Sequence, residues 1–403
     1  MSVKSVIGGS WATWSSIRGN DDDDYVDRLN HLYTVTILVV FALFVGGGQY
    51  VGDPIECWCP AEFTKPFIAY TKSYCWVKNT YFLPMHESIP TSIEEREDSE
   101  IVYYQWIPII LVFMAFMFKI PYIMWKMLNS FSGINLNKIV VLTANTQVGD
   151  AKKRDGMVVN IANYLDKWLY THRQYRNNIA VRVRKNVSAV GCFLFNHREG
   201  TFLTGIYLLC KVFYLANVIG QFFILNGFLG GFYSLYGVEV LDNVVSNKVW
   251  RESLRFPRVT LCDFRIRQLQ NIQRYTVQCV LPINLFNEKI FIFLWFWFLV
   301  VAIITASNFL LWLWRSLFRE NRVKFVKKYL RIVEAINGSS DKKICRRFSD
   351  EYLRDDGIFL LRIVAKNSNE VLLTDLIHYL WKMYNKRLNA EAETDGGDND
   401  DLV

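Results

Sequence analysis

The chain has 403 residues, of which 52% are hydrophobic and 21% charged, and its mean hydropathy is +0.12. This composition is too apolar for an ordinary soluble protein and too charged for a chain lying wholly in lipid. The net charge of +8 is a small excess of 46 basic over 38 acidic residues. Because the basic residues cluster beside apolar runs, the charge does not indicate nucleic-acid binding.

The N-terminal segment, residues 1–19, carries apolar side chains close to helical spacing. They are Val3, Val6, Ile7, Trp11, Trp14 and Ile17. Two interpretations remain open: a short amphipathic helix packed against membrane spans, and a tail without fixed structure, which Gly8 and Gly9 favour. Asp21–Asp24 and Asp27 follow, where carboxylates suit the positive N-terminal end of a helix.

Four long apolar runs are the strongest feature of the sequence. They are Leu32–Val51, Ile107–Trp125, Phe202–Leu225 and Ile290–Trp314. About 20 helical residues cross a bilayer core, so the runs predict four transmembrane helices. Pro121 lies inside the second run and predicts a kink that matters for gating. Lys211 lies near the middle of the third; it either lines a water-filled path or snorkels to the interface.

Loop charge and cysteine placement predict the orientation. Residues 129–200 hold 11 Lys/Arg against 4 Asp/Glu, whereas residues 52–102 hold 4 against 9. The positive-inside rule therefore places residues 129–200 and the C-terminus in the cytoplasm, and an even number of spans then puts both termini there. Residues 227–287, with 7 basic and 4 acidic residues, disagree, but long loops translocate regardless of charge. Five of the eight cysteines fall in the two predicted outer loops, where disulfides persist.

These observations predict an all-α membrane protein. Its expected parts are a four-transmembrane-helix bundle with an N-terminal pore helix, disulfide-linked extracellular loops and a cytoplasmic helical layer. The predicted segments are 1–30 (pore helix and linker), 31–51, 103–128, 201–226 and 288–316 (spans), 52–102 and 227–287 (extracellular loops), 129–200 (cytoplasmic loop), 317–390 (cytoplasmic helical region) and 391–403 (disordered acidic tail).

The sequence shows no constellation that an enzyme would need. The five histidines are scattered without metal-ligand spacing, and there is no P-loop, G-x-G-x-x-G or G-x-S-x-G motif. We therefore expect no catalytic residue, no metal and no cofactor.

The start of the second span is specific. The string Tyr103, Tyr104, Gln105, Trp106, Ile107 and Pro108 closely resembles the Tyr-Tyr-Gln-Trp-Val-Pro signature of innexins, the invertebrate gap-junction proteins. Further strings in matching order resemble the same family. They are Asp24–Asn30, Gly52–Trp58, Phe256–Phe264, Asn287–Trp297 and Asp356–Phe359.

The resemblance implies particular site residues. The expected disulfides are Cys57–Cys279 and Cys75–Cys262, whereas Cys59 departs from the family pattern and its state is open. The resemblance also implies an N-terminal funnel that lines the pore. Its expected pore-lining residues are Ser2, Ser5, Gly8, Gly9 and Trp11.

The resemblance further implies a gap-junction channel subunit in the plasma membrane. The expected assembly is an octameric ring, homo-oligomeric or mixed with other innexins, that docks with a ring on the neighbouring cell. Ions and small molecules would then pass between cytoplasms by diffusion. The alternatives are a pannexin-like hemichannel that releases small metabolites and an accessory or adhesion subunit of junctions.

Overall fold

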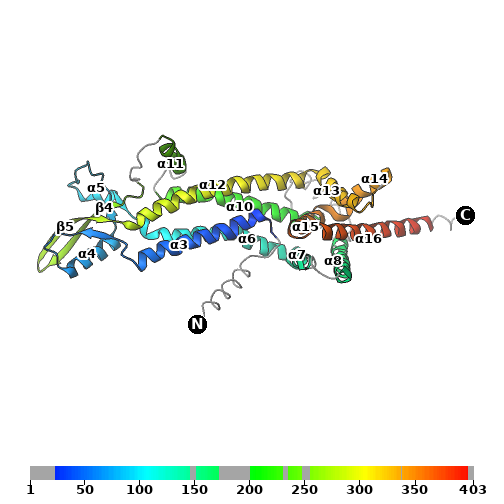
Figure 1. Cartoon of the computed structure of the whole chain (residues 1–403), viewed down its shortest axis with the longest axis horizontal. Helices are drawn as coiled ribbons and strands as arrows, with labels where there is room; N and C mark the ends of the chain where they lie inside the picture. The colour runs from blue at the N-terminus through cyan, green and yellow to red at the C-terminus, as the bar shows by residue number, and fades with distance from the viewer. Residues whose placement is uncertain are drawn as a thin grey trace, which may run out of the picture. The chain divides into compact units, whose positions relative to one another are not determined.

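The computed structural model describes residues 23–145, 151–171, 200–229, 235–246, 255–336 and 338–397 (Figure 1). Four of its helices are long and apolar enough to cross a membrane: Tyr25–Tyr50, Tyr103–Ser130, Phe202–Phe228 and Pro282–Leu317. They confirm the four predicted spans. Large apolar side chains such as Leu43, Phe116 and Phe223 are exposed on these helices, which is favourable against lipid and would be costly in water.

The helices extend beyond the predicted runs. The first combines α2 (Tyr25–Arg28), a π-helical turn η1 (Leu29–Thr34) and α3 (Val35–Tyr50). The second combines a short turn η2 (Tyr103–Trp106) with α6 (Ile107–Ser130). The third is α10 (Phe202–Phe228), and the fourth is α12 (Pro282–Leu317). At 36 residues α12 is about 54 Å long, well beyond the thickness of a bilayer core.

The chain forms two compact units, and α6, α10 and α12 each contribute a segment to both. The first unit comprises residues 1–32, 120–215 and 304–403. Its further helices are α7 (Leu136–Asn145), α8 (Ala151–Thr171), α13 (Arg319–Ile332), α14 (Ser339–Arg347), η4 (Phe348–Leu353), α15 (Arg354–Asn367) and α16 (Glu370–Gly397). These helices form a layer of the kind that the sequence predicts for residues 129–200 and 317–390.

Helix α15 is the centre of this unit. It is buried on nearly every side from Asp356 to Val364, and Phe359 packs its ring against those of Trp125, Tyr207 and Trp312. Helices α8 and α16 pack against each other in the same core. Helix α16 runs to Gly397, although the sequence analysis predicts a disordered tail from Glu391. Alternating Ala and Glu at residues 390–393 explain the extension, because both are strong helix formers.

The second unit comprises residues 33–119 and 216–303. Outside the spans it contains a five-stranded antiparallel sheet in the order β1-β5-β4-β2-β3. The strands are β1 (Glu56–Trp58), β2 (Thr80–Tyr81), β3 (Glu100–Ile101), β4 (Val259–Gln268) and β5 (Asn271–Val280). This sheet differs from the all-α architecture that the sequence predicts.

Three helices accompany the sheet. They are α4 (Lys65–Lys78), α5 (Ile93–Asp98) and α11 (Tyr236–Val245). Helix α4 covers one face of the β4–β5 hairpin, where Phe67 and Tyr74 pack against Phe264, whose ring stacks on Tyr275. This aromatic cluster gives a small sheet the apolar core that it needs to be stable on its own.

Candidate functional sites

Two disulfides join the segments that flank the spans of the second unit. Cys57 on β1 is bonded to Cys279 on β5, and the two residues lie directly opposite each other in the sheet. Cys75 on α4 is bonded to Cys262 on β4. These are the pairs that the family resemblance implies. Both bridges connect the first loop segment to the second, which makes one sheet from two loops 187 or more residues apart.

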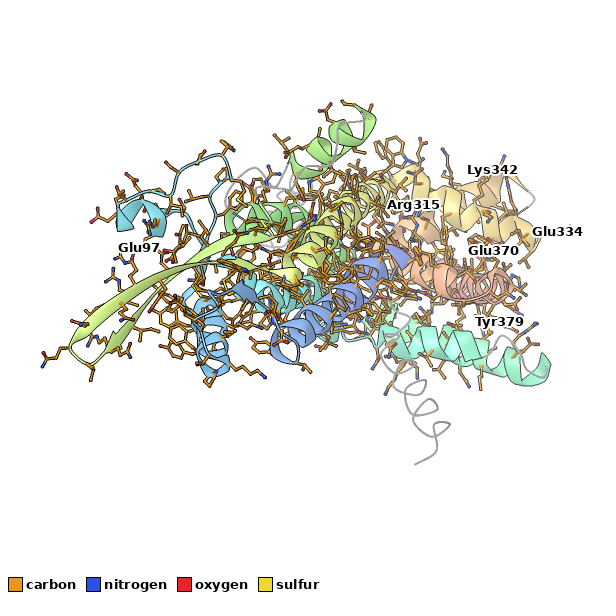
Figure 2. The ribbon with its side chains drawn as sticks, turned by 60° about the vertical axis from the view of Figure 1, so that its left-hand side comes forward. Glu97, Arg315, Glu334, Lys342, Glu370 and Tyr379 are labelled. Atoms are coloured by element: carbon orange, nitrogen blue, oxygen red, sulfur yellow. A yellow bond between two sulfur atoms is a disulfide. The ribbon has the colours of Figure 1, made fainter. Side chains whose placement is uncertain are left out.

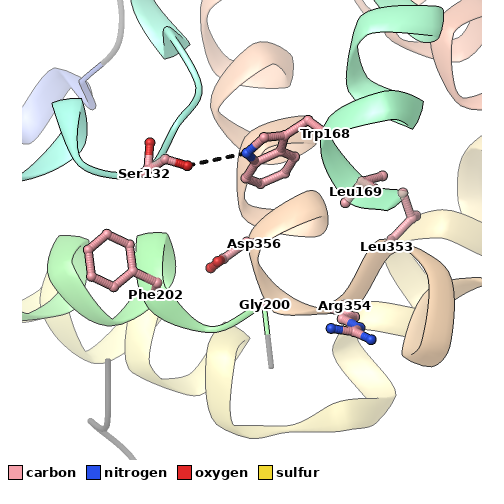
Figure 3. A pocket seen from close by; sticks show the side chains of 8 residues that line it. All are labelled: Ser132, Trp168, Leu169, Gly200, Phe202, Leu353, Arg354 and Asp356. Carbon is pink, nitrogen blue, oxygen red and sulfur yellow. Dashed lines mark hydrogen bonds between the residues drawn. The ribbon is translucent and has the colours of Figure 1, made fainter. Parts of the chain in front are cut away.

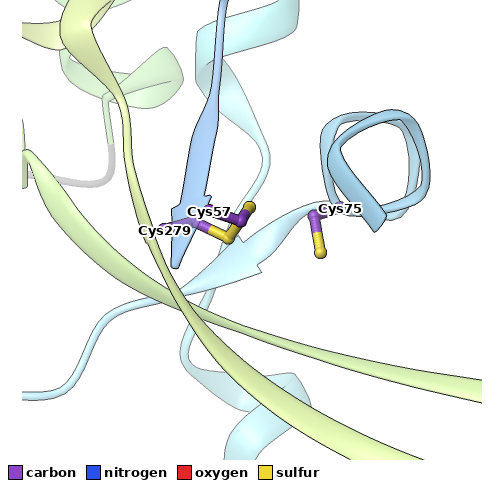
Figure 4. A group of neighbouring side chains, drawn as sticks. All are labelled: Cys57, Cys75 and Cys279. Carbon is purple, nitrogen blue, oxygen red and sulfur yellow. A yellow bond between two sulfur atoms is a disulfide. The ribbon is translucent and has the colours of Figure 1, made fainter. Parts of the chain in front are cut away.

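The sulfur atoms of Cys57, Cys75 and Cys279 lie within 4.8 Å of one another (Figure 4). Three thiolates at this spacing would bind a metal ion such as zinc. Here each sulfur is already bonded to another cysteine, so no thiolate is left to act as a ligand. Cys59 is a free thiol, and burial raises its pKa above 9.0 although Lys72 opposes the shift. It is therefore a weak nucleophile at neutral pH.

The signature residues connect the sheet to the spans of the same unit. Gln49 in α3 donates a hydrogen bond to the carbonyl oxygen of Tyr104 at 2.6 Å. The side-chain amide of Gln105 donates to the backbone of Trp76 and to the side chain of Asn79, at the end of α4. Pro108 lies in the first turn of α6, where no helical hydrogen bond is lost. Positioning, not chemistry, is what these side chains supply.

The structure describes the predicted kink residue Pro121 but not the predicted pore-lining residues. Pro121 lies buried in the interior of α6, and the helix is continuous through it. A proline there removes the hydrogen bond to the carbonyl four residues earlier. The predicted pore-lining residues Ser2, Ser5, Gly8, Gly9 and Trp11 lie outside the described residues.

A buried charge cluster lies in the first unit, at the start of the first span. We define it as Asp23, Asp24, Asp27, Arg28, Lys211 and Lys366. Asp24 caps α2 with its side chain, and Asp27 accepts a hydrogen bond from the backbone N–H of Asp24. The three carboxylates therefore crowd around one helical turn, where the helix dipole alone does not balance their charge.

Cations from two distant helices neutralise the carboxylates. Lys211 in α10 is 1% exposed and places Nζ 2.7 Å from Oδ1 of Asp27 and 2.7 Å from Oδ1 of Asn308. Lys366 in α15 reaches Oδ2 of Asp24 at 2.5 Å. Lys211 therefore neither snorkels nor lines a described water path, because it is part of a buried ion pair.

Burial and the neighbouring charges also shift the pKa values of groups in the cluster. Burial alone would raise the pKa of Asp24, but Lys211 and Lys366 outweigh it and hold that pKa below 3.8. Trp312 adds an Nε1–H bond to the same carboxylate at 2.9 Å. Burial lowers the pKa of Lys366 from 10.5, with Asp24 opposing the shift. The sequence indicates only a helix-dipole role for these aspartates, and nothing in it marks Lys366 as their partner.

A second contact joins α15 to the start of α10 (Figure 3). Asp356 accepts hydrogen bonds from the backbone N–H of Thr204 at 2.9 Å and from its hydroxyl at 3.0 Å. The backbone N–H of Asp356 donates in turn to the carbonyl of Gly200 at 2.8 Å. The carboxylate thus caps the N-terminus of α10 from another part of the chain.

This capping site is tightly built. Gly200 has a φ of +68°, and a Cβ there would lie 2.9 Å from Cδ of Arg354. The adjoining cavity, about 20 Å³ in volume, has room for little more than one water molecule. Burial raises the pKa of Asp356 to about 6, against the hydrogen bonds from Thr204. The carboxyl group of Asp356, which titrates near neutral pH, therefore holds α15 to the start of α10, and the site is not a ligand pocket.

Four bilayer-length helices, an adjoining cross-linked sheet and an ionic cluster at the start of the first span define a four-span integral membrane protein. Similar proteins identify the family of membrane proteins to which it belongs. The innexin family model matches residues 23–384. The chain is 41% identical to innexin unc-9 of Caenorhabditis elegans, over 92% of this chain and 94% of that protein. It is 34% identical to innexin-19 of Caenorhabditis briggsae, over 98% and 93%, and 31% identical to innexin eat-5 of Caenorhabditis elegans, over 93% and 90%. The chain therefore belongs to the innexin family, and it is a gap-junction channel subunit.

Proposed function

We propose that this chain forms rings, octameric by analogy with its family, that dock end to end with rings on a neighbouring cell. Ions and small molecules then diffuse through the joined pores. The rings form from this chain alone or together with other innexins. The observation that carries the proposal is the sheet in which two disulfides fix both loop segments. A surface that must bind its own copy gains affinity when it is already ordered.

The proposed topology places this sheet outside the cell and helices α7, α8 and α13 to α16 inside it. It is supported by the loop charges and by the bonded cysteines, since disulfides form in oxidising compartments. Epitope tags at residue 150 and after residue 403 should stain only permeabilised cells. A tag inserted after Leu269, at the hairpin turn, should stain intact cells, and the opposite pattern would overturn the topology.

We further propose that residues 1–19 line the cytoplasmic mouth of the pore. The support is their apolar stripe and the position of α2, which the buried charge cluster holds firmly just after them. Deleting residues 2–19 should change unitary conductance or the permeant size while surface levels hold. An unchanged conductance and unchanged dye passage would refute a pore-lining segment.

Paired-cell recording tests the junctional function. Two cells that each express only this chain should develop junctional current, whereas pairs with one expressing cell should not. Current in single cells without any junctional current would indicate a hemichannel. Coupling that appears only when another innexin is added would indicate an accessory subunit.

A further inference from the structure

The outer part of the β4–β5 hairpin stands clear of the rest of its sheet. β1 pairs only with residues 278–280 of β5, and β2 pairs with Leu261 of β4. Beyond these points, residues 263–268 and 271–276 pair with each other and with no other described strand (Figure 1). One face of this extension packs on α4 through Phe264 and Tyr275. The other face carries Arg265, Arg267 and Arg274.

The arginine face carries positive charge that no ion pair within the described residues neutralises. Arg265 lies directly opposite Arg274, and Arg267 lies two residues further along the same face. Like charges directly opposite each other in a sheet repel. All three are exposed, and within the described ranges none forms an ion pair. The carboxylate on this face, Asp263, is already bound by Arg96 at 2.6 Å and by the hydroxyl of Tyr81.

The turn of the hairpin is also unusual for an exposed loop. Leu269 has a φ of +57° and is fully exposed, and Ile272 is 63% exposed. A two-residue hairpin turn normally places Gly, Asn or Asp at positive φ, because these residues adopt it with little strain. An exposed, strained leucine between arginines is poorly suited to water. It has the composition of a protein interface, in which apolar anchors lie beside arginine.

The complementary charge is found on α5 of the same unit. Glu94, Glu95, Glu97 and Asp98 are all exposed, and Figure 2 shows Glu97 on this helix. Arg96 is the one cation of α5, and its guanidinium is already bonded to Asp263. Helix α5 therefore exposes four carboxylates to solvent, and its one cation is not free to neutralise them. The bond from Arg96 to Asp263 also anchors it to the sheet.

We propose that the arginine face of the hairpin, Arg265, Arg267 and Arg274, binds the acidic helix α5 of a second copy of this chain in the opposed ring. The inference rests on the proposed docking function and assigns it a surface. A two-fold relation between the copies makes each contact twice, since hairpin meets helix in both directions. Leu269 and Ile272 supply the apolar part of the contact. The long-range attraction of the two patches orients the rings before they touch.

Charge reversal in paired cells tests this assignment. The hairpin variant is Arg265→Glu with Arg274→Glu, and the helix variant is Glu94→Lys with Glu95→Lys and Glu97→Lys. Either variant paired with wild type should lose junctional conductance by about tenfold or more, because like charges then face each other. The hairpin variant in one cell paired with the helix variant in the other should recover coupling: the reversed hairpin then faces the reversed helix, and the other reciprocal contact keeps its wild-type charges.

Matched controls separate docking from folding and from ring assembly. Gln268→Glu with Gln273→Glu changes the charge by −2, half of the −4 of the hairpin variant, but on the face that packs on α4, and it should couple normally. Surface labelling and native-gel migration of the ring should be unchanged in all variants. Loss of the ring itself would show that the arginines act between neighbours within a ring and would overturn the proposal.

The remaining outcomes are also decisive. Coupling that survives hairpin charge reversal, or that the reversed helix fails to rescue, would overturn the assignment while the docking function stands. If wild-type pairs do not couple, the proposed function itself fails, and this inference fails with it.

Discussion

Replacing Lys211 by Met should strongly destabilise the protein. The ammonium is almost fully buried and donates to Asp27 and Asn308, with Asp24 at 3.8 Å. Met matches the apolar stem of lysine but removes the charge. Asp27 then keeps only the hydroxyl of Tyr207 and the backbone N–H of Asp24 as donors.

The magnitude follows from leaving a carboxylate buried without its cation. Removing one partner of a buried ion pair costs about 3–5 kcal/mol. With an unfolding entropy of roughly 2.1 cal/mol/K per residue, this loss lowers the Tm of a chain of this length by roughly 4–6 °C. The double variant Lys211→Met with Asp27→Asn should recover much of the loss, because the introduced amide is neutral and its oxygen still accepts a hydrogen bond from Tyr207.

The assay is a thermal melt of the full-length channel in detergent, followed by fluorescence-detected size exclusion. Lys382→Met, which removes an exposed lysine of α16 in the same unit, is the control and should change Tm by less than 1 °C or so. A melt of Lys211→Met that matches wild type would refute the reasoning. So would a double variant whose loss equals the sum of the two single losses.

Three further predictions concern other sites. Burial raises the pKa of Asp356 from 3.8 to about 6, so this site contributes stability below pH 4 that is lost as pH rises through 6, an effect of about 3 kcal/mol. The Tm of Asp356→Asn should therefore rise relative to the Tm of wild type between pH 4.5 and pH 7.5. A difference in Tm that stays constant over this range would contradict the prediction. Replacing Cys75 or Cys262 by Ser should lower the free energy of unfolding by roughly 2–5 kcal/mol and abolish junctional current. Cys59→Ser, at a free thiol, should keep both the stability and the junctional current of wild type. Equal effects at all three positions would be inconsistent with the two disulfides. Pro121→Ala should leave surface expression intact but change the voltage or pH sensitivity of the junctional current, because it restores a hydrogen bond inside α6; unchanged gating would leave the proline with no role beyond tolerance.

The spans could be predicted because their signal is local and large. Each run is long enough to cross a bilayer and carries almost no charge, and hydropathy reads that property directly. The ends were less predictable. The first span begins at Tyr25, within a stretch rich in aspartate, because the charges there are satisfied by Lys211 and Lys366. A sequence does not reveal a partner that lies 184 or 342 residues away.

The sheet was missed for a different reason. Its inward-facing residues on β4 are Thr260, Cys262 and Phe264, while Leu261 faces the other way. Apolar and polar residues therefore do not alternate cleanly, which weakens the usual strand signal. The turn at Leu269 lacks the Gly or Asn that marks a two-residue hairpin. Only the cysteines showed that the two segments belong together, and their pairing came from family resemblance, since spacing alone does not fix connectivity.

The two units are stabilised by different chemistry, and the proposed topology explains why. Outside the cell, where thiols oxidise, two disulfides join loop segments 187 and 222 residues apart. At the other end of the first span, which the proposed topology places toward the cytoplasm, disulfides would not persist, and α2 is held by buried ion pairs to α10 and α15 instead. A covalent link holds its geometry whatever the charge state, which suits a surface that must match its copy on another cell. An ionic cluster holds its geometry only while every charge is paired, because each unpaired charge in a buried site is costly. Displacing α15 would therefore separate Lys366 from Asp24 and loosen the first turn of the first span.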